Sequence, residues 1–231
     1  PMYMPQGFQI ALAEKAKAVV SIPVFAGGRM QAFRQATQAI EEGRLDGITL
    51  GRPSLADPEI PNKLFADHPE DIRPCLGCNL GCYDRLVSKG LYGSCAVNPQ
   101  AARESIDGLK PGEGKKKIVV VGGGVAGMGA GRTAFMRGHD VPLYEKSNVL
   151  GGNLIPAGAH DFKHEVNCLN EYYKYQMKKL GVDVKLNTEV NTEMLRNLNA
   201  DAIILAVGSV PVMPRIDGID HPKTVSGVDA L

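Results

Sequence analysis

The sequence has almost no excess charge of either sign. Its 26 Lys and Arg side chains face 25 Asp and Glu side chains, which leaves a formal net charge of +1. This balance predicts no nucleic-acid partner, because proteins that hold a phosphate backbone carry a clear basic excess. No apolar run approaches the ~18 residues of a membrane helix, so we expect no membrane partner. No secretory signal pattern is recognised, and we expect a cytoplasmic, reducing location.

What is present is the composition of a globular protein, with 44% hydrophobic and 22% charged residues. The first ~70 residues read as α/β. An apolar run over 19–26 ends in Gly27-Gly28-Arg29, a helical pattern covers 31–42, and a second strand over 47–50 ends in Gly51-Arg52-Pro53. Strand, helix and strand, with glycine at each strand's carboxyl end, are typical of a parallel sheet.

The α/β pattern resumes at Ile118, after a segment rich in Cys, Gly, Asn and Pro over 70–100 and a linker-like stretch at 108–114. These changes in composition predict boundaries between segments of the chain near residues 70 and 110. The elements expected beyond the second boundary are strands over 118–121, 141–144, 182–186 and 202–207, and helices ending near 137 and spanning 163–180.

Four of the five cysteines lie within 21 consecutive positions. Cys75, Cys78, Cys82 and Cys95 have the spacing C-x2-C-x3-C-x12-C. In a reducing compartment a disulfide framework is disfavoured. Structural zinc stays open, but zinc ribbons usually use two close pairs, and Cys82 and Cys95 are not a close pair. Three ligands from one loop plus a fourth favour a four-iron cluster. Cys168 stands alone in a helical pattern and is expected to be a buried, small apolar residue.

A glycine turn follows the strand over 118–121. Gly122, Gly124 and Gly127 form G-x-G-x-x-G, with Ala126 inside the motif, and open a helix. Glu145 follows 23 residues after Gly122, at the end of the next strand. This context predicts a dinucleotide site, with a pyrophosphate on the helix N-terminus and Glu145 accepting hydrogen bonds from ribose hydroxyls.

Two further stretches favour FAD over NAD at this turn. Leu150-Gly151-Gly152 follows closely after Glu145-Lys146, and the strand over 202–207 runs into Gly208. Both stretches are typical of flavin-binding, disulfide-reductase-like domains. We therefore include Lys146, Gly152 and Gly208 among the expected cofactor-binding residues.

The two Gly-Arg strand ends are a weaker signal. If Gly28-Arg29 and Gly51-Arg52 close the last two strands of a barrel, their loops form a phosphate site. Backbone N–H groups and an arginine fork would then hold the phosphate of FMN. Taken alone, an arginine after a strand is more often a solvated or ion-pairing residue.

Read together, these motifs resemble one family. GRPSLADPEIPNKL, IRPCLGCNLGC, SCAVNP and VVVGGGVAGMGAG with YEKSNVLGG are similar to the iron–sulfur flavoenzymes of the NADH:flavin oxidoreductase (old yellow enzyme-like) type. The resemblance runs over essentially the whole chain. The family includes 2,4-dienoyl-CoA reductase, trimethylamine dehydrogenase, and the enoate and bile-acid reductases.

The resemblance implies that this chain contains three consecutive parts, and that the first and the last of them are incomplete. Residues 1–69 would be the C-terminal strands and helices of a TIM-barrel FMN domain, 70–107 an iron–sulfur segment, and 108–231 a Rossmann-like FAD-binding domain. Gly28, Arg29, Gly51 and Arg52 then match the FMN phosphate site, and the four clustered cysteines match the cluster ligands. The chain would be an internal fragment: the proton-donating residues are expected upstream of Pro1, and the NAD(P)H domain beyond Leu231.

The function implied is reduction of an activated C=C in a small unsaturated substrate. Electrons would pass from NAD(P)H through FAD and the 4Fe-4S cluster to FMN. An amine dehydrogenase of the trimethylamine type, which passes electrons outward, is the alternative within this class. A zinc-stabilised, non-catalytic nucleotide-binding module is the alternative outside it. Homo-oligomerisation is left open by the sequence.

Overall fold

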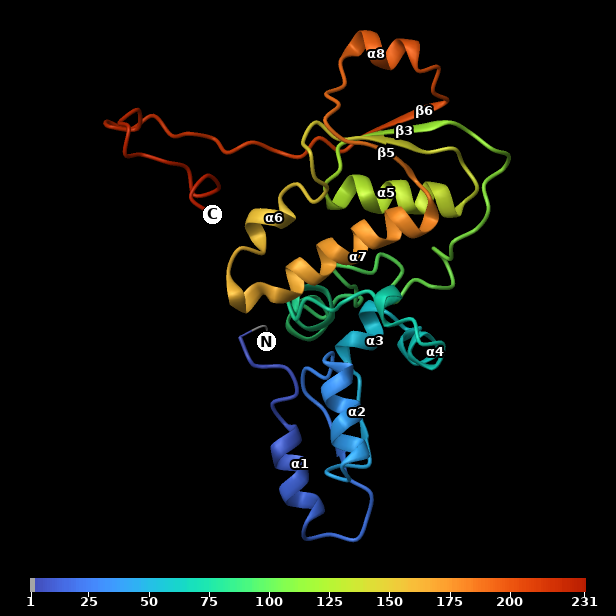
Figure 1. Ribbon diagram of the computed structural model, residues 1–231, viewed down its shortest axis with the longest axis vertical. Helices are drawn as coiled ribbons and strands as arrows, with labels where there is room; N and C mark the ends of the chain where they lie inside the picture. Colours follow the sequence, from blue (N-terminus) through green and yellow to red (C-terminus); the bar gives the residue numbers. More distant parts are fainter. Residues whose placement is uncertain (1–2) are drawn as a thin grey trace. The chain divides into compact units, whose positions relative to one another are not determined.

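The computed structural model describes residues 3–231, which form two compact units. The first unit extends to Gly108, and the second covers Leu109–Leu231. Each unit has its own hydrophobic core, and Figure 1 shows the chain coloured from one end to the other. We describe the two units separately.

The first unit begins with a short parallel α/β arrangement. Its elements are α1 (Ile10–Lys17), β1 (Phe25–Ala26), α2 (Phe33–Glu41) and β2 (Gly47–Ile48). β1 pairs with β2 in parallel, with Phe25 opposite Gly47. The strand expected over 19–26 is paired only at its last two residues. Earlier in the run Val19 is 81% exposed, and pairing with β2 begins only at Phe25.

Helices connect β2 to the cysteine segment. They are α3 (Arg52–Ala56), α4 (Ile60–Phe65), a 3-10 turn (Pro69–Asp71) and a π-type helix (Leu80–Ser88). The buried carboxylate of Asp57 follows α3 and accepts from Lys63 Nζ at 2.5 Å and from the backbone N–H of Arg73 at 2.8 Å. A buried carboxylate needs such partners to offset its desolvation. Asp57 thereby fixes the chain two residues before Cys75.

Asn98 fixes the other end of the cysteine segment to the same helix. Its side chain, 3% exposed, donates from Nδ2 to the Leu55 carbonyl oxygen at 2.9 Å and accepts from the Gln100 N–H at 3.1 Å. We expect Asn98→Ala to lower the free energy of unfolding by about 1–3 kcal/mol, because it removes both hydrogen bonds of a buried side chain and leaves a cavity-prone site in its place. Urea unfolding at neutral pH measures the loss.

The matched control for that substitution is Asn62→Ala. Asn62 also makes one side-chain hydrogen bond, from Nδ2 to Glu59 Oε2 at 2.7 Å, but it is exposed on α4. Its removal should change stability by no more than about 0.5 kcal/mol. Equal stability losses in the two variants would contradict the anchoring role of Asn98.

The second unit is built on a four-stranded parallel sheet in the order β5-β4-β3-β6. The predicted strands and long helices are present, each within a few residues of the expected ends. Their bounds are β3 (Ile118–Val121), α5 (Val125–Met136), β4 (Pro142–Tyr144), α6 (Leu154–Ala157), a 3-10 turn (Asp161–Lys163), α7 (His164–Leu180), β5 (Asp183–Lys185), α8 (Thr192–Asn197) and β6 (Ala202–Leu205).

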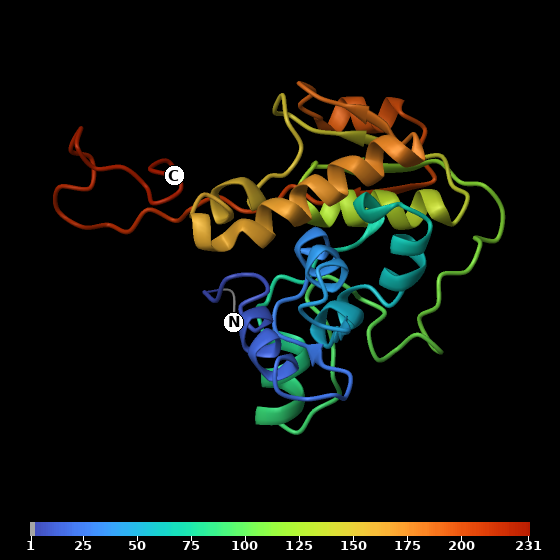
Figure 2. The same ribbon diagram turned by 60° about the horizontal axis from the view of Figure 1, so that its bottom comes forward.

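The core of the second unit lies between the sheet and helices α5 and α7. Val120 and Leu143 from the sheet, Met128 from α5 and Met177 from α7 are all essentially inaccessible to solvent. Figures 1 and 2 show α5 and α7 running side by side along one face of the sheet, and Figure 1 shows α8 on the other. This packing holds the carboxyl ends of β3, β4 and β6 at one edge, where the glycine motif lies.

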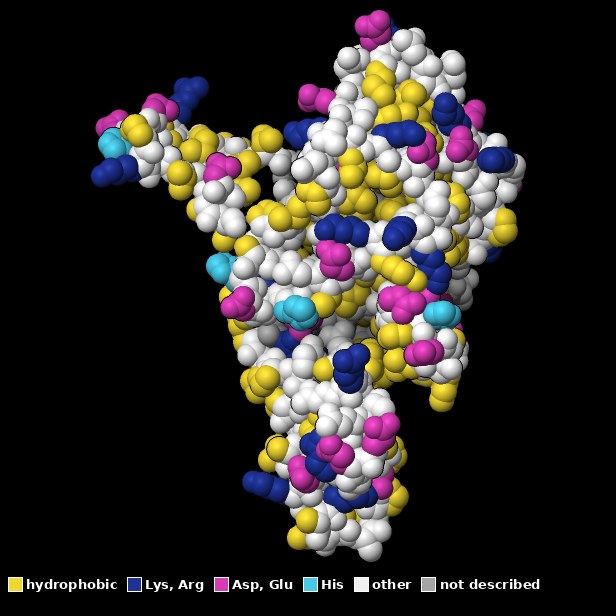
Figure 3. All heavy atoms as spheres, viewed as in Figure 1, with side chains coloured by type: hydrophobic (Ala, Val, Ile, Leu, Met, Phe, Trp, Pro, Cys, Tyr) yellow, Lys and Arg dark blue, Asp and Glu magenta, His cyan; other side chains and the backbone are white. Residues whose placement is uncertain are grey.

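The surface carries both signs of charge. In Figure 3, Lys and Arg side chains alternate with Asp and Glu side chains over the face shown, in keeping with the net charge of +1. Among residues 3–231, no helix combines the length and the hydropathy that a bilayer crossing requires.

Candidate cofactor sites

The four clustered cysteines converge on one pocket. Cys75 and Cys78 lie in the loop before the π-type helix, Cys82 lies in its first turn, and Cys95 lies on the returning chain. All are half-buried and carry free thiols. The rest of the lining is largely apolar and consists of Arg52, Leu55, Leu76, Asn79, Gly81, Ala96 and Val97.

Backbone geometry explains how the short spacing brings these cysteines together. Gly77 and Asn79 have φ of 64° and 60°, so the chain turns sharply on both sides of Cys78. Gly81 lies against the next segment: a Cβ there would overlap the Ser94 carbonyl oxygen, and Ser94 N–H donates to the Gly81 carbonyl at 3.2 Å. The glycine therefore permits the close approach that places Cys95 beside the other three.

The spacing of the sulfur atoms distinguishes between kinds of metal group. In the part of the chain that the structure describes, no three cysteine sulfurs lie within 4.8 Å of one another. A tetrahedral zinc ion, with Zn–S bonds of about 2.3 Å, would need every pair of sulfurs roughly 3.8 Å apart. A cluster that takes one thiolate at each of several irons holds its sulfurs further apart. The donor set therefore fits a cluster better than a single ion.

Binding of a metal group also depends on whether the Cys75 thiol is ionised. Burial raises the pKa of the Cys75 thiol, while the Gly77 N–H, 3.4 Å from Sγ, and the positive charge of Arg52 oppose that rise. A buried thiol resists ionisation, and a bound metal group compensates for this by stabilising the thiolate.

The two Gly-Arg strand ends line a second pocket. Its lining is Gly28, Arg29, Met30, Gln31, Thr49, Gly51, Arg52, Pro53, Cys75 and Gly77. Gly28 and Arg29 have φ of 87° and 52°, the left-handed conformation that turns the loop after β1 toward the pocket. Burial, followed by the like charge of Arg52, lowers the pKa of Arg29. Two guanidinium groups that converge in this way suit an anion such as a phosphate.

The G-x-G-x-x-G turn lies at the carboxyl edge of the second unit's sheet. Gly122 has φ of 107°, and Gly127 packs so closely that a Cβ would overlap the Gly122 carbonyl oxygen. Gly124 differs: a Cβ there would come no nearer than 3.9 Å to the chain, at Gly152 Cα. Packing thus requires Gly127 to be glycine but does not require it of Gly124, whose open side is free for a ligand to approach.

The remaining predicted residues surround this turn. The Gly151 N–H donates to the Gly123 carbonyl at 2.9 Å, which places Gly152 beside Gly124. Ala126 is exposed in the first turn of α5, Lys146 is exposed after β4, and Gly208 follows β6 at the same edge. The structure therefore gathers all of the predicted FAD residues at one edge of the sheet.

Glu145 has a role that the sequence did not predict. Its carboxylate accepts from the Gly123 N–H at 2.6 Å and from the Ser147 N–H at 2.8 Å. Burial would raise the pKa of Glu145, but these backbone hydrogen bonds, together with the Ser147 side chain and the positive charge of Lys146, hold that pKa below its usual value. Glu145 therefore braces the glycine turn through the Gly123 N–H.

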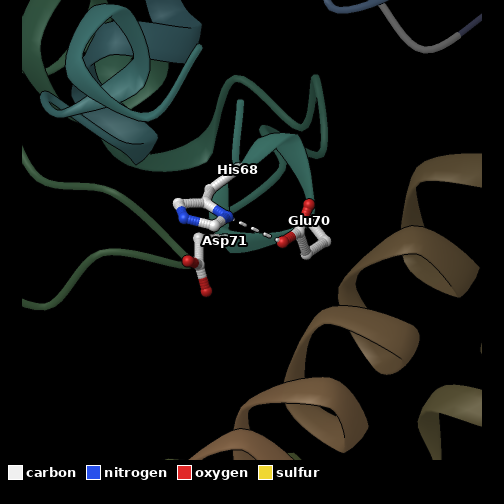
Figure 4. Close-up of side chains that lie close together, drawn as sticks. All are labelled: His68, Glu70 and Asp71. Carbon is white, nitrogen blue, oxygen red and sulfur yellow. Dashed lines mark hydrogen bonds and ion pairs between the residues drawn. The ribbon is translucent and has the colours of Figure 1, made fainter. Parts of the chain in front are cut away.

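A group of three side chains outside these pockets resembles a metal site. His68, Glu70 and Asp71 place ligand atoms within 4.8 Å of one another, and His68 Nδ1 lies 3.3 Å from Glu70 (Figure 4). His68 and Glu70 are exposed, and we assign this group no metal.

Cys168 is half-buried with Sγ 3.2 Å from His164 Nε2, so the prediction of a buried, apolar cysteine is wrong. His164 and Cys168 are four positions apart on α7, a spacing that places their side chains next to each other on one face of the helix.

Comparison with known proteins agrees with this geometry. Residues 116–231 match the pyridine nucleotide-disulphide oxidoreductase family. The whole chain is 46% identical to cinnamate reductase of Clostridium sporogenes, of which it covers 34%. The chain belongs to the iron–sulfur NADH:flavin oxidoreductases.

Solved structures in this family of flavoenzymes match closely. A 2-naphthoyl-CoA reductase in complex with 2-naphthoyl-CoA is 34% identical with a TM-score of 0.92, and the match covers 99% of this chain and 35% of that one. A 6-hydroxypseudooxynicotine amine oxidase from Pseudomonas geniculata N1 is 29% identical with a TM-score of 0.85, covering 96% and 35%. The chain thus spans about a third of the length of these relatives.

Proposed function

We propose that this chain holds the FMN phosphate, a 4Fe-4S cluster and the adenosine half of FAD in an NAD(P)H-dependent oxidoreductase that reduces activated C=C bonds. One observation carries the proposal. The pocket of the four cysteines and the pocket of the two Gly-Arg loops share Arg52 and Cys75, so the two pockets abut within one unit.

The cluster assignment rests on the donor set. Cys75, Cys78, Cys82 and Cys95 are the four thiolates, and the spacing of their sulfurs disfavours a single zinc ion. Apolar neighbours such as Leu76 and Val97 limit solvent access, which tunes the potential of a cluster.

The FMN assignment rests on converging cations and loop conformation. Arg29 and Arg52 approach one pocket from the carboxyl ends of two parallel strands, together with Gly28 and Gly51. This is where barrels commonly bind phosphate, and the parallel β1–β2 pair is compatible with a barrel edge. The guanidinium groups would neutralise and orient the phosphate.

The FAD assignment rests on the sheet as well as the glycine motif. The order β5-β4-β3-β6 is the strand order 3-2-1-4 of a dinucleotide-binding fold, with the glycine turn after its first strand. The N-terminus of α5, capped by Gly124, faces the position of a pyrophosphate. Gly122, Gly127, Gly152 and Gly208 shape the backbone around that position, and Ala126 and Lys146 line its rim.

When bound, the three groups would supply an electron path from NAD(P)H through FAD and the cluster to FMN and then to substrate. This chain's residues would fix the positions of the groups and exclude water from the cluster pocket. The names of the reductase relatives, which refer to cinnamate and to 2-naphthoyl-CoA, point to unsaturated acids or their thioesters as substrates.

An amine dehydrogenase is the second candidate, and the amine oxidase among the structural relatives favours it. The two functions are separated by assaying the full-length protein anaerobically. NAD(P)H oxidation that depends on an added enoate supports the reductase. Reduction of an artificial acceptor by a secondary or tertiary amine, with no enoate-dependent NAD(P)H oxidation, supports the dehydrogenase.

The phosphate site has its own test in Arg29→Met. Loss of a charged hydrogen-bond donor to phosphate costs about 1.5–3 kcal/mol, so we expect FMN affinity to fall about 10- to 100-fold. Riboflavin, which lacks the phosphate, should bind both proteins equally. Arg103→Met, at an exposed arginine paired with Asp107, is the control and should leave FMN affinity unchanged. Equal losses for FMN and riboflavin would contradict the phosphate role.

A further inference from the structure

Gln31 joins the two cofactor pockets of the first unit. It lies two residues after Arg29, in the turn between β1 and α2, and it lines the Gly-Arg pocket. Its side-chain amide is bonded to the backbone of Cys75 at both ends. Nε2 donates to the Cys75 carbonyl oxygen at 2.9 Å, and Oε1 accepts from the Cys75 N–H at 2.7 Å.

This paired arrangement constrains Cys75 more than one hydrogen bond would. The two bonds join residues 44 positions apart and satisfy both backbone groups of the cysteine through one planar amide. They fix the position of the Cys75 peptide and its orientation. Sγ of Cys75 must reach the cysteine pocket, so the amide also sets where that sulfur lies.

The turn that carries Gln31 is itself held in place. The Gln31 N–H donates to Gln6 Oε1 at 3.2 Å, and the Gly7 N–H donates to the Arg29 carbonyl oxygen at 3.1 Å. The buried side chain of Met30 packs into the core of the first unit. The face of the turn that lines the pocket carries Gly28 and Arg29, both with positive φ.

We propose that Gln31 is a positioning residue that couples occupancy of the Gly-Arg pocket by a phosphate to retention of the metal cluster. This inference rests on the proposed function, since it requires both groups to bind. A phosphate held by Gly28 and Arg29 stabilises the turn in the conformation that places the Gln31 amide against Cys75. By linkage, a cluster on Cys75 favours phosphate binding to the same degree.

The test follows the loss of the cluster's visible absorbance when an iron chelator is added to the full-length protein, with FMN bound and after the flavin is removed. In the native protein we expect bound FMN to slow the loss. Gln31→Leu should lose its cluster about tenfold faster with FMN bound, as expected for the loss of two ordinary hydrogen bonds. Its loss rate should also depend less on FMN.

Gln38→Leu is the matched control. Gln38 lies on α2, where its exposed amide donates to Glu42 Oε1 at 2.7 Å, and it should behave as the native protein does. Gln31→Glu is the second variant for this test and replaces Gln31→Leu if that protein fails to fold. It keeps the shape and an acceptor for the Cys75 N–H but removes the donor. We expect an intermediate loss rate and a lower midpoint potential for the cluster, because a negative charge is added beside a ligand.

The outcomes separate this inference from the proposed function. Absence of an iron–sulfur absorbance band in the native protein overturns the proposed function, and this inference with it. A normal band, with a loss rate and an FMN dependence in Gln31→Leu equal to those of Gln38→Leu, overturns the coupling alone. So does a Gln31→Glu variant with native loss rate and native midpoint potential.

Discussion

Replacing Cys78 with alanine is expected to abolish electron transfer from NAD(P)H to substrate while leaving reduction of FAD by NAD(P)H intact. Cys78 is one of four cysteines that line one pocket, and it stands between the two left-handed residues that shape the loop. Cys78 would supply one of the four thiolates that hold the proposed cluster, so its removal should lose or alter that cluster. The FAD residues belong to the other unit and keep their own packing.

The measurement has two parts on the full-length protein under anaerobic conditions. Stopped-flow absorbance follows bleaching of FAD by NAD(P)H, and steady-state turnover follows substrate reduction. Cys168→Ala is the control, because Cys168 is also a half-buried free thiol but lies on α7, outside the cysteine pocket. Turnover at the native rate in Cys78→Ala would contradict the relay.

Replacing Gly127 with alanine is expected to remove FAD and to destabilise the second unit. A Cβ at this position would overlap the carbonyl oxygen of Gly122, and the clash is with backbone, which cannot rotate away. Relieving it requires α5 to move from β3 or the glycine turn to open. Overpacking of this kind costs about 1–3 kcal/mol, and a displaced turn should lower FAD occupancy by at least tenfold.

Gly129→Ala provides a control on the same helix. A Cβ at Gly129 would meet only the Tyr173 ring and hydroxyl, at 3.7 Å or more, which is ordinary contact. Since alanine is favoured over glycine inside a helix by about 1 kcal/mol, this variant should retain FAD and unfold at an equal or higher temperature. Equal FAD losses in the two variants would show that close packing of the turn is not the cause.

The sequence predicted the second unit well because its signals are local. The glycine motif lies directly between a strand and a helix, and the 3.6-residue pattern of α7 extends over several turns, so the elements and their order follow from neighbouring residues. The first unit was harder. Its apolar run over 19–26 reads as a strand, yet only Phe25–Ala26 is paired, because pairing depends on residues far away in the sequence.

In the candidate sites, too, local features could be predicted from the sequence and contacts between distant residues could not. Cysteine spacing predicted that Cys75, Cys78, Cys82 and Cys95 meet, since three of them lie within eight residues. The side chains that support them could not be predicted. Gln31 and Cys75 are separated by 44 positions, and nothing in the composition around Gln31 marks its amide as a partner for a cysteine peptide.

Metal and acid-labile sulfide analysis of the anaerobically purified, full-length protein tests the central claim most directly. Cys75, Cys78, Cys82 and Cys95 line one pocket, and among the described residues no three of their sulfurs lie within 4.8 Å of one another. The expected result is about four irons and four sulfides per chain, with the visible absorbance of a cluster. One tightly bound zinc ion per chain, with no labile sulfide and no visible absorbance beyond that of flavin, would contradict it.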